Sequence, residues 1–363
     1  MAMVRPLILI ALALTFSFNA LAQGTVYVRA AGSDSNDGTT ESSAKKTIQA
    51  AVKVAQSGDI IDVGPGSFAG ASLDKGLVLQ GSNANYDIAR WDVPTVITST
   101  VSLDSKAAGA SVTLIGLQFG GITPLAGRAE NAMITIYNCK FIGSKPIITS
   151  GTNWAELFFT ASILDGKPEG AKQDAATATA LVLGDVGVVV FRENVIRNYA
   201  KSAIDVAGSG QIVRISYNEF SLCNSSVDVA HAAVRIEASA IQEEMTVENC
   251  LFTSCATSVS VAGTISGKTV SVQRNSFLRS PAVTPVIRCT SPTALNATCN
   301  AFNIPTKEKG QPLSKQAISA AITKLATGNI STSPTNIGAT DKDGTSIGYE
   351  PIAEEACAFE LAK

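Results

Sequence analysis

The side chains best suited to acid–base chemistry gather in the stretch 192–248. Two carboxylates about 5 Å apart could serve as the acid and nucleophile of a retaining glycosidase, or could hold Ca²⁺ together. A carboxylate-bound Ca²⁺ beside a Lys or Arg base could instead remove a proton from a uronate sugar, because the metal neutralises the sugar carboxylate and acidifies that proton. The candidates for such a centre are Asp205, Asp228, Arg235 and Glu237.

Whether two of these carboxylates meet depends on the register of one long sequence repeat. Counting forward from Phe220 places Asp228 beside Asp205, whereas counting back from Phe252 places Arg235 there. The first register brings two carboxyls about 5 Å apart, and the second makes an ordinary ion pair between neighbouring strands. Charged residues normally occupy outward strand positions, which favours a structural role. Both registers stay open at the level of the sequence.

Two loop segments and one histidine offer further chemistry. Residues 32–38 and 341–344 resemble fragments of calcium-binding loops, and Asp34 and Asp37 are the weak metal candidates. Neither segment has the closing Glu of an EF-hand, and turn formation by Asn, Asp and Gly explains both. His231 is the sole histidine and a possible acid or base. A surface histidine without a catalytic role is favoured, because no nucleophile with a supporting carboxylate can be placed near it.

Three aromatic residues are candidates for sugar binding. Tyr137 and Phe158 are expected to project outward from successive repeats, with Trp154 just before Phe158. Exposed aromatic rings can stack on the apolar faces of sugars, and a cluster of them on a solvent face needs a reason. The alternative is that a loop or the C-terminal tail covers them.

All these residues must be positioned by a repeated strand. Five alternating strands end with the same pattern, an Asn or Cys two places before a phenylalanine. Weaker copies of this pattern end at Phe119, Leu164 and Ile196. The eight end positions are 22 to 32 residues apart. A period of this length with one short strand per unit predicts a solenoid, in which each unit buries its apolar side against its neighbours. The five clear copies are Cys139/Phe141, Asn218/Phe220, Cys250/Phe252, Asn275/Phe277 and Asn300/Phe302.

The residue types separate two kinds of solenoid. A leucine-rich horseshoe needs several leucines per unit, whereas the inward positions here are Val, Ile and Phe. The second half of each unit also alternates, as in residues 203–208 and 258–263, which predicts more strands. We therefore expect a parallel β-helix of about ten coils, stacked at an inter-strand spacing of about 4.8 Å.

The cysteines follow the same repeat. Cys223 and Cys255 each lie three residues after a repeat phenylalanine. This places them on adjacent coils at a Cα separation of about 5 Å, within disulfide range. We predict a disulfide between them, and we expect Cys139 and Cys250, which lie several coils apart, to be free and buried. Cys357 could tether the tail to an unidentified partner.

The N-terminal segment and the charge composition limit where the protein acts and what kinds of partner it can have. Arg5, the apolar run from Leu7 to Phe18 and the small residues 20–22 predict an export signal over residues 1–22. We therefore expect a secreted or cell-surface protein, with the periplasm as an alternative, and no membrane span in the mature chain. The chain has 28 basic and 30 acidic residues, and the basic residues form no run. This pattern argues against a nucleic-acid partner.

The N-terminal motifs resemble a known family. Tyr27-Val28, the segment 32–38, Lys46-Thr-Ile-Gln-Ala-Ala51 and Gly64-Pro-Gly66 with Phe68 look like the cap and first coil of exported right-handed parallel β-helix proteins of the pectate-lyase-like superfamily. Together with the Asn/Phe repeats, the resemblance covers most of residues 25–302. The expected divisions are a signal peptide (1–22), an N-terminal strand, capping helix and first coil (23–70), β-helix coils (71–303), a C-terminal capping helix (304–330) and an extended tail (331–363).

The resemblance implies a fold more than a function, because the superfamily includes lyases, hydrolases, epimerases, adhesins and proteins without known activity. The chain has neither the Gly-His-Gly and Arg-Ile-Lys strings of polygalacturonases nor the Arg-x-Pro-x-x-Arg string of the commonest pectate lyases. We therefore expect a non-catalytic protein that binds polysaccharide or acts as a surface scaffold. The alternatives are a polysaccharide lyase or hydrolase acting on an acidic glycan, with Ca²⁺ as its possible cofactor, and an adhesin or envelope protein with a protein partner.

Overall fold

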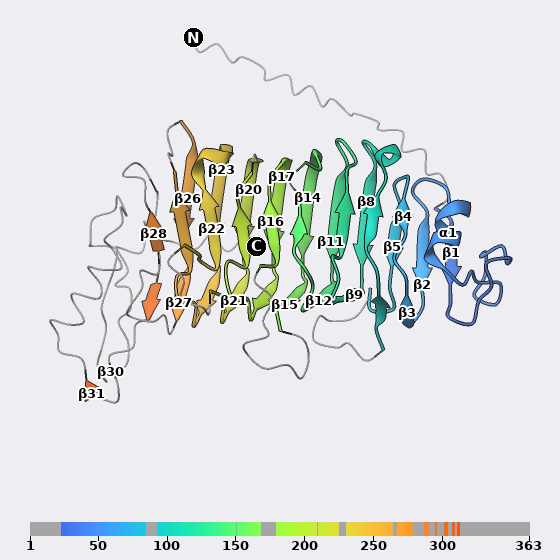
Figure 1. Ribbon diagram of the computed structural model, residues 1–363, viewed down its shortest axis with the longest axis horizontal. Helices are drawn as coiled ribbons and strands as arrows, with labels where there is room; N and C mark the ends of the chain where they lie inside the picture. Colours follow the sequence, from blue (N-terminus) through green and yellow to red (C-terminus); the bar gives the residue numbers. More distant parts are fainter. Residues whose placement is uncertain are drawn as a thin grey trace, which may run out of the picture.

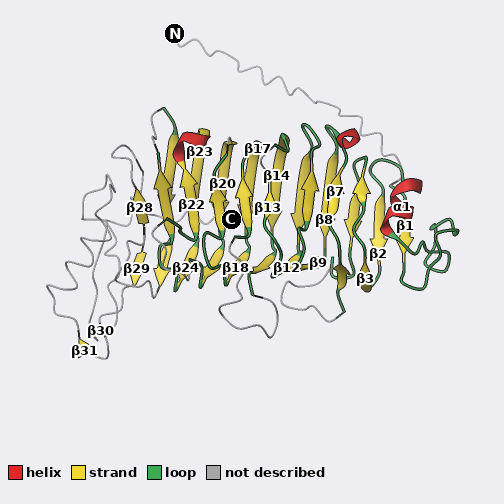
Figure 2. Ribbon diagram, viewed as in Figure 1, coloured by secondary structure: helices red, strands yellow, loops and turns green. Residues whose placement is uncertain are grey.

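The chain winds into a parallel β-helix, seen side-on in the computed structural model (Figure 1). The expected fold class is confirmed: strands dominate, and every neighbouring pair within the coils is parallel (Figure 2). The structure describes residues 23–84, 93–149, 151–167, 179–208, 210–224, 230–263, 267–278, 287–289, 295, 301–303, 307–308 and 311–312.

Two ten-stranded sheets form two sides of the coil. Sheet A contains β1 (Thr25–Val28), β2 (Ile60–Val63), β5 (Val78–Gln80), β8 (Ser111–Ile115), β11 (Met133–Tyr137), β14 (Trp154–Thr160), β17 (Val186–Arg192), β20 (Gly210–Ser216), β23 (Ile241–Glu248) and β26 (Thr269–Gln273). Sheet B contains β3 (Gly66–Phe68), β6 (Thr95–Ile97), β9 (Leu117–Gly120), β12 (Lys140–Ile142), β15 (Ile163–Asp165), β18 (Val195–Arg197), β21 (Glu219–Ser221), β24 (Leu251–Thr253), β27 (Ser276–Leu278) and β29 (Ala301–Asn303).

The third side is divided between two shorter sheets. Sheet C contains β4 (Ser72–Leu73), β7 (Val101–Leu103) and β10 (Leu125–Gly127), and sheet D contains β13 (Ile147–Ile148), β16 (Leu181–Leu183), β19 (Ile204–Val206), β22 (Val234–Glu237), β25 (Val259–Ala262) and β28 (Ile287–Cys289). The other elements are the helix α1 (Ile48–Val54), the 3₁₀ turns η1 (Ser105–Ala107) and η3 (Ala238–Ala240), and the strands β30 (Lys307–Glu308) and β31 (Gln311–Pro312).

The repeat phenylalanines stack inside the coil on sheet B. Phe220 lies opposite Phe252 in the strand register, with ring centroids 4.7 Å apart, and Phe252 stacks on Phe277 at 5.1 Å. All three rings are fully buried. Stacked aromatic pairs at this separation contribute about 0.5–1.5 kcal/mol beyond the area that they bury.

The weaker repeats are compensated across the core. Sheet B carries Leu164 and Ile196 in place of phenylalanine, and the same two coils carry Phe159 and Phe191 at the inward positions of sheet A. These two rings are 5.0 Å apart and fully buried. Because a protein interior is packed to nearly constant density, an aromatic ring on one side of the coil takes the space that an aliphatic residue leaves on the other.

A buried polar ladder runs beside the phenylalanines at the repeat Asn position. Asn218 Oδ1 accepts from the backbone N–H of Asn194 at 2.9 Å, and Asn194 Oδ1 accepts from that of Ser162 at the same distance. Asn275 Oδ1 does the same for the N–H of Cys250 at 2.9 Å. Each asparagine therefore satisfies the backbone of the coil before it, which explains why a polar side chain recurs inside the core.

The residue just before this ladder takes a left-handed backbone conformation in each coil. The ladder asparagines Asn194, Asn218 and Asn275 do not themselves have positive φ angles. The positive φ angles, which L-residues other than Asn and Asp rarely adopt, occur one place earlier. The residues concerned are Gly116, Asn138, Ala161, Glu193, Tyr217, Asn249 and Arg274.

The N-terminal helix forms at the end of the stack, beside β1 (Figure 1). It lies within the expected division 23–70, and its buried residues Ile48, Ala51 and Val52 join the core. Thr47 caps it by accepting from the backbone N–H of Ala50. Most of the segment 304–330, where a C-terminal capping helix is expected, lies outside the described residues. Its described part is the short antiparallel pair β30 and β31.

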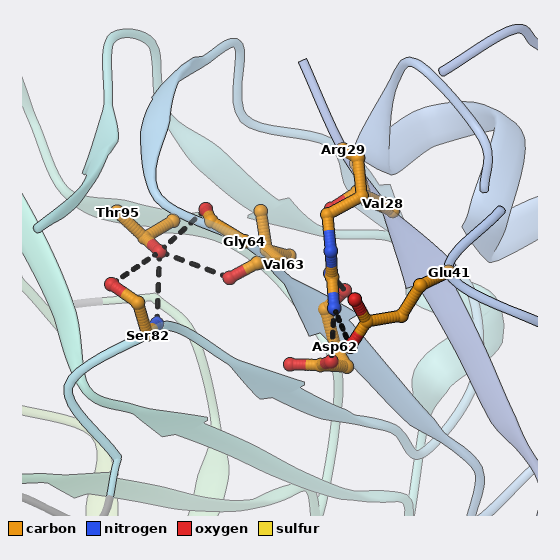
Figure 3. Close-up of polar contacts among 8 residues, drawn as sticks. All are labelled: Val28, Arg29, Glu41, Asp62, Val63, Gly64, Ser82 and Thr95. Atoms are coloured by element: carbon orange, nitrogen blue, oxygen red, sulfur yellow. Dashed lines mark hydrogen bonds and ion pairs between the residues drawn. The ribbon is translucent and has the colours of Figure 1, made fainter. Parts of the chain in front are cut away.

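The glycine motif of the first coil is explained by Arg29. Its guanidinium bonds the Asp62 carboxylate at 2.8 Å and the Glu41 carboxylate at 3.0 Å, as Figure 3 shows. A Cβ on Gly64 would lie 2.7 Å from Arg29 Cδ, so the arginine can cross this turn only over a glycine. Beside it, the buried Thr95 hydroxyl bonds the carbonyls of Val63 and Gly64 (Figure 3).

Cys223 and Cys255 are free thiols, so the predicted disulfide is absent from the structure. Their predicted placement agrees with the register, which continues from Phe220 opposite Phe252. Each sulfur lies near a backbone carbonyl of the preceding coil, at 3.7 Å from Ile196 O and 3.8 Å from Phe220 O. The thiols are thus held as weak donors along the stack, and burial together with the neighbouring Cys255 thiol raises the pKa of Cys223 well above its ordinary value.

Cys139 and Cys250 are free and buried, as expected. Both occupy the ladder position of their coils, where the Cys139 N–H donates to the Ser162 hydroxyl at 3.0 Å. Burial raises the pKa of each of these two thiols to about 12. A thiol with so high a pKa stays protonated at neutral pH and is a poor nucleophile.

Candidate functional site

The strand register resolves the ambiguity in the predicted acid–base centre. Arg235 lies directly opposite Asp205 in sheet D, and its guanidinium donates to the Asp205 carboxylate at 2.7 Å. Asp228 lies outside the described residues. The pair is therefore the cross-coil ion pair that one of the two registers predicts, and a carboxylate dyad through Asp205 does not form at this strand position.

Glu237 completes a small charged cluster on the outside of sheet D. Its carboxylate lies 4.0 Å from the Arg235 guanidinium and accepts from the Ser239 hydroxyl at 2.8 Å. The side chains of Asp205, Arg235 and Glu237 are between 22 % and 30 % exposed. One guanidinium between two carboxylates leaves one negative charge in excess, and such partly exposed ion pairs stabilise the sheet surface modestly.

His231 packs against the turn that precedes β19. Its Nδ1 lies 3.3 Å from the Ser202 hydroxyl, and its carbonyl accepts from the Asn224 amide. The ring is half-buried. The ring is thus linked by one hydrogen bond to Ser202 of the preceding coil, and its expected lack of a catalytic role stays a prediction.

The carboxylates of the weak calcium candidates, Asp34 and Asp37, accept hydrogen bonds from nearby residues of the N-terminal segment. The Asp34 carboxylate accepts from the backbone N–H groups of Lys46 and Thr47 and from the Thr47 hydroxyl. Desolvation raises the pKa of Asp34, but these hydrogen bonds outweigh it and lower the pKa overall. Asp37 accepts from Ser43 and Thr39, and the Ser43 hydroxyl is the main cause of its lowered pKa. In the described part of the chain, no cluster of three or more metal-ligating side chains occurs.

The aromatic candidates divide into two groups. Tyr137 is 42 % exposed, and Phe158 is half-buried on the same outward face of sheet A, two register positions away because Phe158 pairs with Thr135. Trp154 is only 2 % exposed and packs into the core, so it is not an exposed ring on this face, although it contributes to the lining of the hollow described below. Its indole nitrogen has no hydrogen-bond partner.

The burial pattern of β14 explains the error over Trp154. Alternation fails at the start of the strand, where Ala155 and Glu156 are both half-buried before Leu157 turns inward. The same irregularity occurs in the neighbouring strand β17 at Gly187 and Val188. An even spacing between Trp154 and Phe158 would put both on one face in a regular strand, but this irregular step reverses the tryptophan.

The outward face of sheet A carries an apolar stripe across four successive strands. Phe158 is followed in register by Val190 on the next coil, and Met133 and Val188 lie in the parallel column with Glu156 between them. Met133 is 38 % exposed, and the others are partly exposed. Contiguous apolar patches on a protein surface often mark a binding site. This stripe lies outside the solenoid, so it contributes nothing to the packing of the interior. The residues of this stripe are Met133, Phe158, Val188, Val190 and Ile212.

A hollow of about 390 Å³ opens at the end of the stripe, where β14, β17, β20 and β23 begin. The small residues Ala155, Gly187 and Gly210, called its floor below, leave space where other residues would place side chains, and Trp154, Val186 and Val188 also line it. Polar groups surround this floor. The turn residues Asn131, Asn153 and Asp185 belong to three successive coils, and Gln242 lies on β23.

The three turn residues share one backbone conformation. Asn131, Asn153 and Asp185 have φ angles of 59°, 53° and 54°. The Asn131 N–H donates to the Asn153 carbonyl at 2.8 Å, and the Asp185 carboxylate accepts from the Gly151 N–H. Asn and Asp tolerate the left-handed region better than other side chains, so the corner of the coil itself selects the polar residues that line the hollow.

Sequence reasoning missed this hollow. Its floor is made by residues that lack side chains, and its rim comes from turns 22 and 32 residues apart in the chain, which is the separation of Asn131, Asn153 and Asp185. The available signal was an Asn or Asp one or two places before the sheet A strand in three successive repeats. The hollow, the stripe and Tyr137 together form the candidate site.

No known protein family and no curated protein sequence matches this chain. Among the described residues, no helix is long and apolar enough to cross a membrane.

Proposed function

We propose that the protein binds polysaccharide on the outward face of sheet A, without catalysis of its own. The observation that carries this proposal is the continuity between an apolar stripe and a polar hollow on one face. Sugar rings present apolar C–H faces together with hydroxyl groups. The ring of Phe158 offers a stacking surface, and the amides of Asn131 and Asn153 offer hydrogen bonds within the same face.

The geometry of a solenoid suits a polymer better than a small molecule. The coils repeat along one axis, so equivalent outward positions recur at about 4.8 Å. The stripe crosses four coils through Met133, Phe158, Val190 and Ile212. A ligand that lies along the axis therefore meets similar side chains several times, and weak contacts add up through multivalency.

The setting of this function is part of the same proposal. The apolar N-terminal run and the small residues after it support export to the cell surface or the surrounding medium. The parallel β-helix, together with the N-terminal motifs quoted above, supports membership of the pectate-lyase-like superfamily. The pairing of Asp205 with Arg235 favours binding over lysis, because a guanidinium held by a carboxylate is a poor base.

Affinity electrophoresis tests the proposal directly. The purified protein is run through gels that contain neutral or uronate polysaccharides, and the same mixtures are assayed for unsaturated uronate products with and without Ca²⁺. We expect retardation without product. Tyr137→Ala combined with Phe158→Ala should weaken binding roughly tenfold, since each aromatic contact contributes about 0.5–1.5 kcal/mol.

Leu222→Ala is the matched control, because Leu222 is 40 % exposed but lies beyond sheet B rather than on the stripe. This variant should bind as the original protein does. Formation of unsaturated product would make the protein a lyase. Absence of retardation in every gel would overturn the proposal and turn attention to a protein partner.

A further inference from the structure

We propose that the hollow beside Ala155 receives a neutral sugar unit and discriminates against uronates. This inference rests on the proposed function and narrows it to a substrate class. It is carried by the shape of the hollow, by the donors and acceptors on its rim, and by the charges around it.

The shape comes from backbone rather than from flexible side chains. A Cβ on Gly187 would lie 2.7 Å from the Ala155 carbonyl oxygen, closer than real contacts allow, so this coil can approach its neighbour only through a glycine. Gly210 extends the same floor on the next coil. The hollow of about 390 Å³ lies at the small end of ligand pockets, which suits a single sugar unit of a longer chain.

The rim supplies both kinds of hydrogen-bonding group. Asn131, Asn153 and Gln242 are exposed, and each amide carries donors and an acceptor. Asp185 adds a half-buried carboxylate that accepts only. A sugar hydroxyl both donates and accepts, so its two roles can be met on the same rim.

The charges around the hollow are negative. Asp185 lines it, and Glu156 of β14 pairs in register with Val188, another lining residue. The described lining residues include no Lys or Arg. Arg214, on the intervening strand β20, is engaged by the Glu244 carboxylate at 3.1 Å. A uronate carboxylate placed several ångströms from Asp185 would be repelled, and at surface dielectric values this disfavours binding by roughly tenfold.

Titration calorimetry with two oligosaccharide probes tests the inference. One probe is a neutral glucan oligosaccharide, and the other is an oligogalacturonate of the same length. We expect the neutral probe to bind at least tenfold more tightly. Asp185→Asn should raise the affinity for oligogalacturonate several-fold and change the affinity for the glucan little, because an Asn side chain can still accept from the Gly151 N–H.

Glu219→Gln removes a carboxylate from sheet B and serves as the matched control, with no expected change for either probe. A steric variant adds an independent readout. Ala155→Phe should abolish glucan binding, whereas Gln118→Phe, which places the same ring on sheet B, should not. Circular dichroism and thermal unfolding identify variants that fail to fold, and the steric pair decides the matter if Asp185→Asn is one of them.

The outcomes separate the two proposals. Preferential binding of oligogalacturonate, or an unchanged preference in Asp185→Asn, overturns the inference and leaves polysaccharide binding intact. Glucan binding that survives Ala155→Phe moves the ligand away from the hollow and also overturns it. Failure of both probes and of all polysaccharide gels overturns the proposed function itself.

Discussion

The interior of the coil and the outward face of sheet A differ in how regularly their residue types repeat from coil to coil. Inside, Phe220, Phe252 and Phe277 repeat one residue type at one position, and the asparagine ladder repeats beside them. Outside, the positions that pair with Phe158 carry Thr135 on one side and Val190 on the other. The interior repeats because each coil must bury its apolar side on the next. The outward face is free of that demand, so its irregular composition is where binding can be encoded.

The largest expected effect is the loss of a stacked interior ring. Phe220→Ala should destabilise the protein by about 3–5 kcal/mol, because a buried phenylalanine leaves a cavity that stacked coils fill poorly. Phe158→Ala, the same change on the outward face, should cost about 1 kcal/mol or less. Chemical denaturation of both variants measures the difference. Equal destabilisation would show that another part of the chain covers the stripe, so that Phe158 is as buried as Phe220.

A smaller loss is expected from the polar ladder. Asn218→Ala removes the acceptor of the Asn194 N–H and leaves a buried donor without a partner, which costs about 1–3 kcal/mol. Asn218→Ser should recover part of this loss, since Ser162 already occupies the equivalent position. Denaturation midpoints of the three proteins test the order. If the alanine and serine variants are equally stable, the ladder contributes through volume rather than through hydrogen bonds.

The smallest expected signal is the reaction of the interior thiols. The raised pKa of Cys139 and Cys250, about 12 in each case, leaves almost no thiolate at pH 8. Thiolate formation grows only as the pH rises toward that pKa, so the folded protein should resist alkylation and the unfolded protein should react. Peptide mapping by mass spectrometry measures both. A cross-linked peptide joining Cys223 and Cys255 would show that this pair oxidises despite its thiol state in the structure.

The repeat predicted the fold because interior positions leave few alternatives. Val, Ile and Phe alternate wherever a strand faces the core, and the spacing of the repeat phenylalanines matches the strand pairing of Phe220 with Phe252 and of Phe252 with Phe277. The unit between Phe220 and Phe252 was ambiguous because its extra residues could be placed before or after Asp228. Only the pairing of Asp205 with Arg235 resolved it.

The candidate site was harder to predict because it depends on exceptions to the strand pattern. Trp154 turns inward only because alternation fails at Ala155 and Glu156, and simple periodicity contains no such step. The hollow depends on Gly187 and Gly210, which in a sequence suggest a bend or a close approach but not an opening between coils. To predict its rim from the sequence, three repeats would also have to be aligned at their turns rather than at their strands.

The direction of the strand pairing has a mechanical consequence. The strands run across the long axis of the stack (Figure 1), so the hydrogen bonds that join coils run along it. A pull on the two ends of the solenoid would load one coil-to-coil seam at a time and peel coils in sequence at modest force. A polymer held across several coils of sheet A would bridge those seams, and its attachment would then stiffen the protein against extension along its own length.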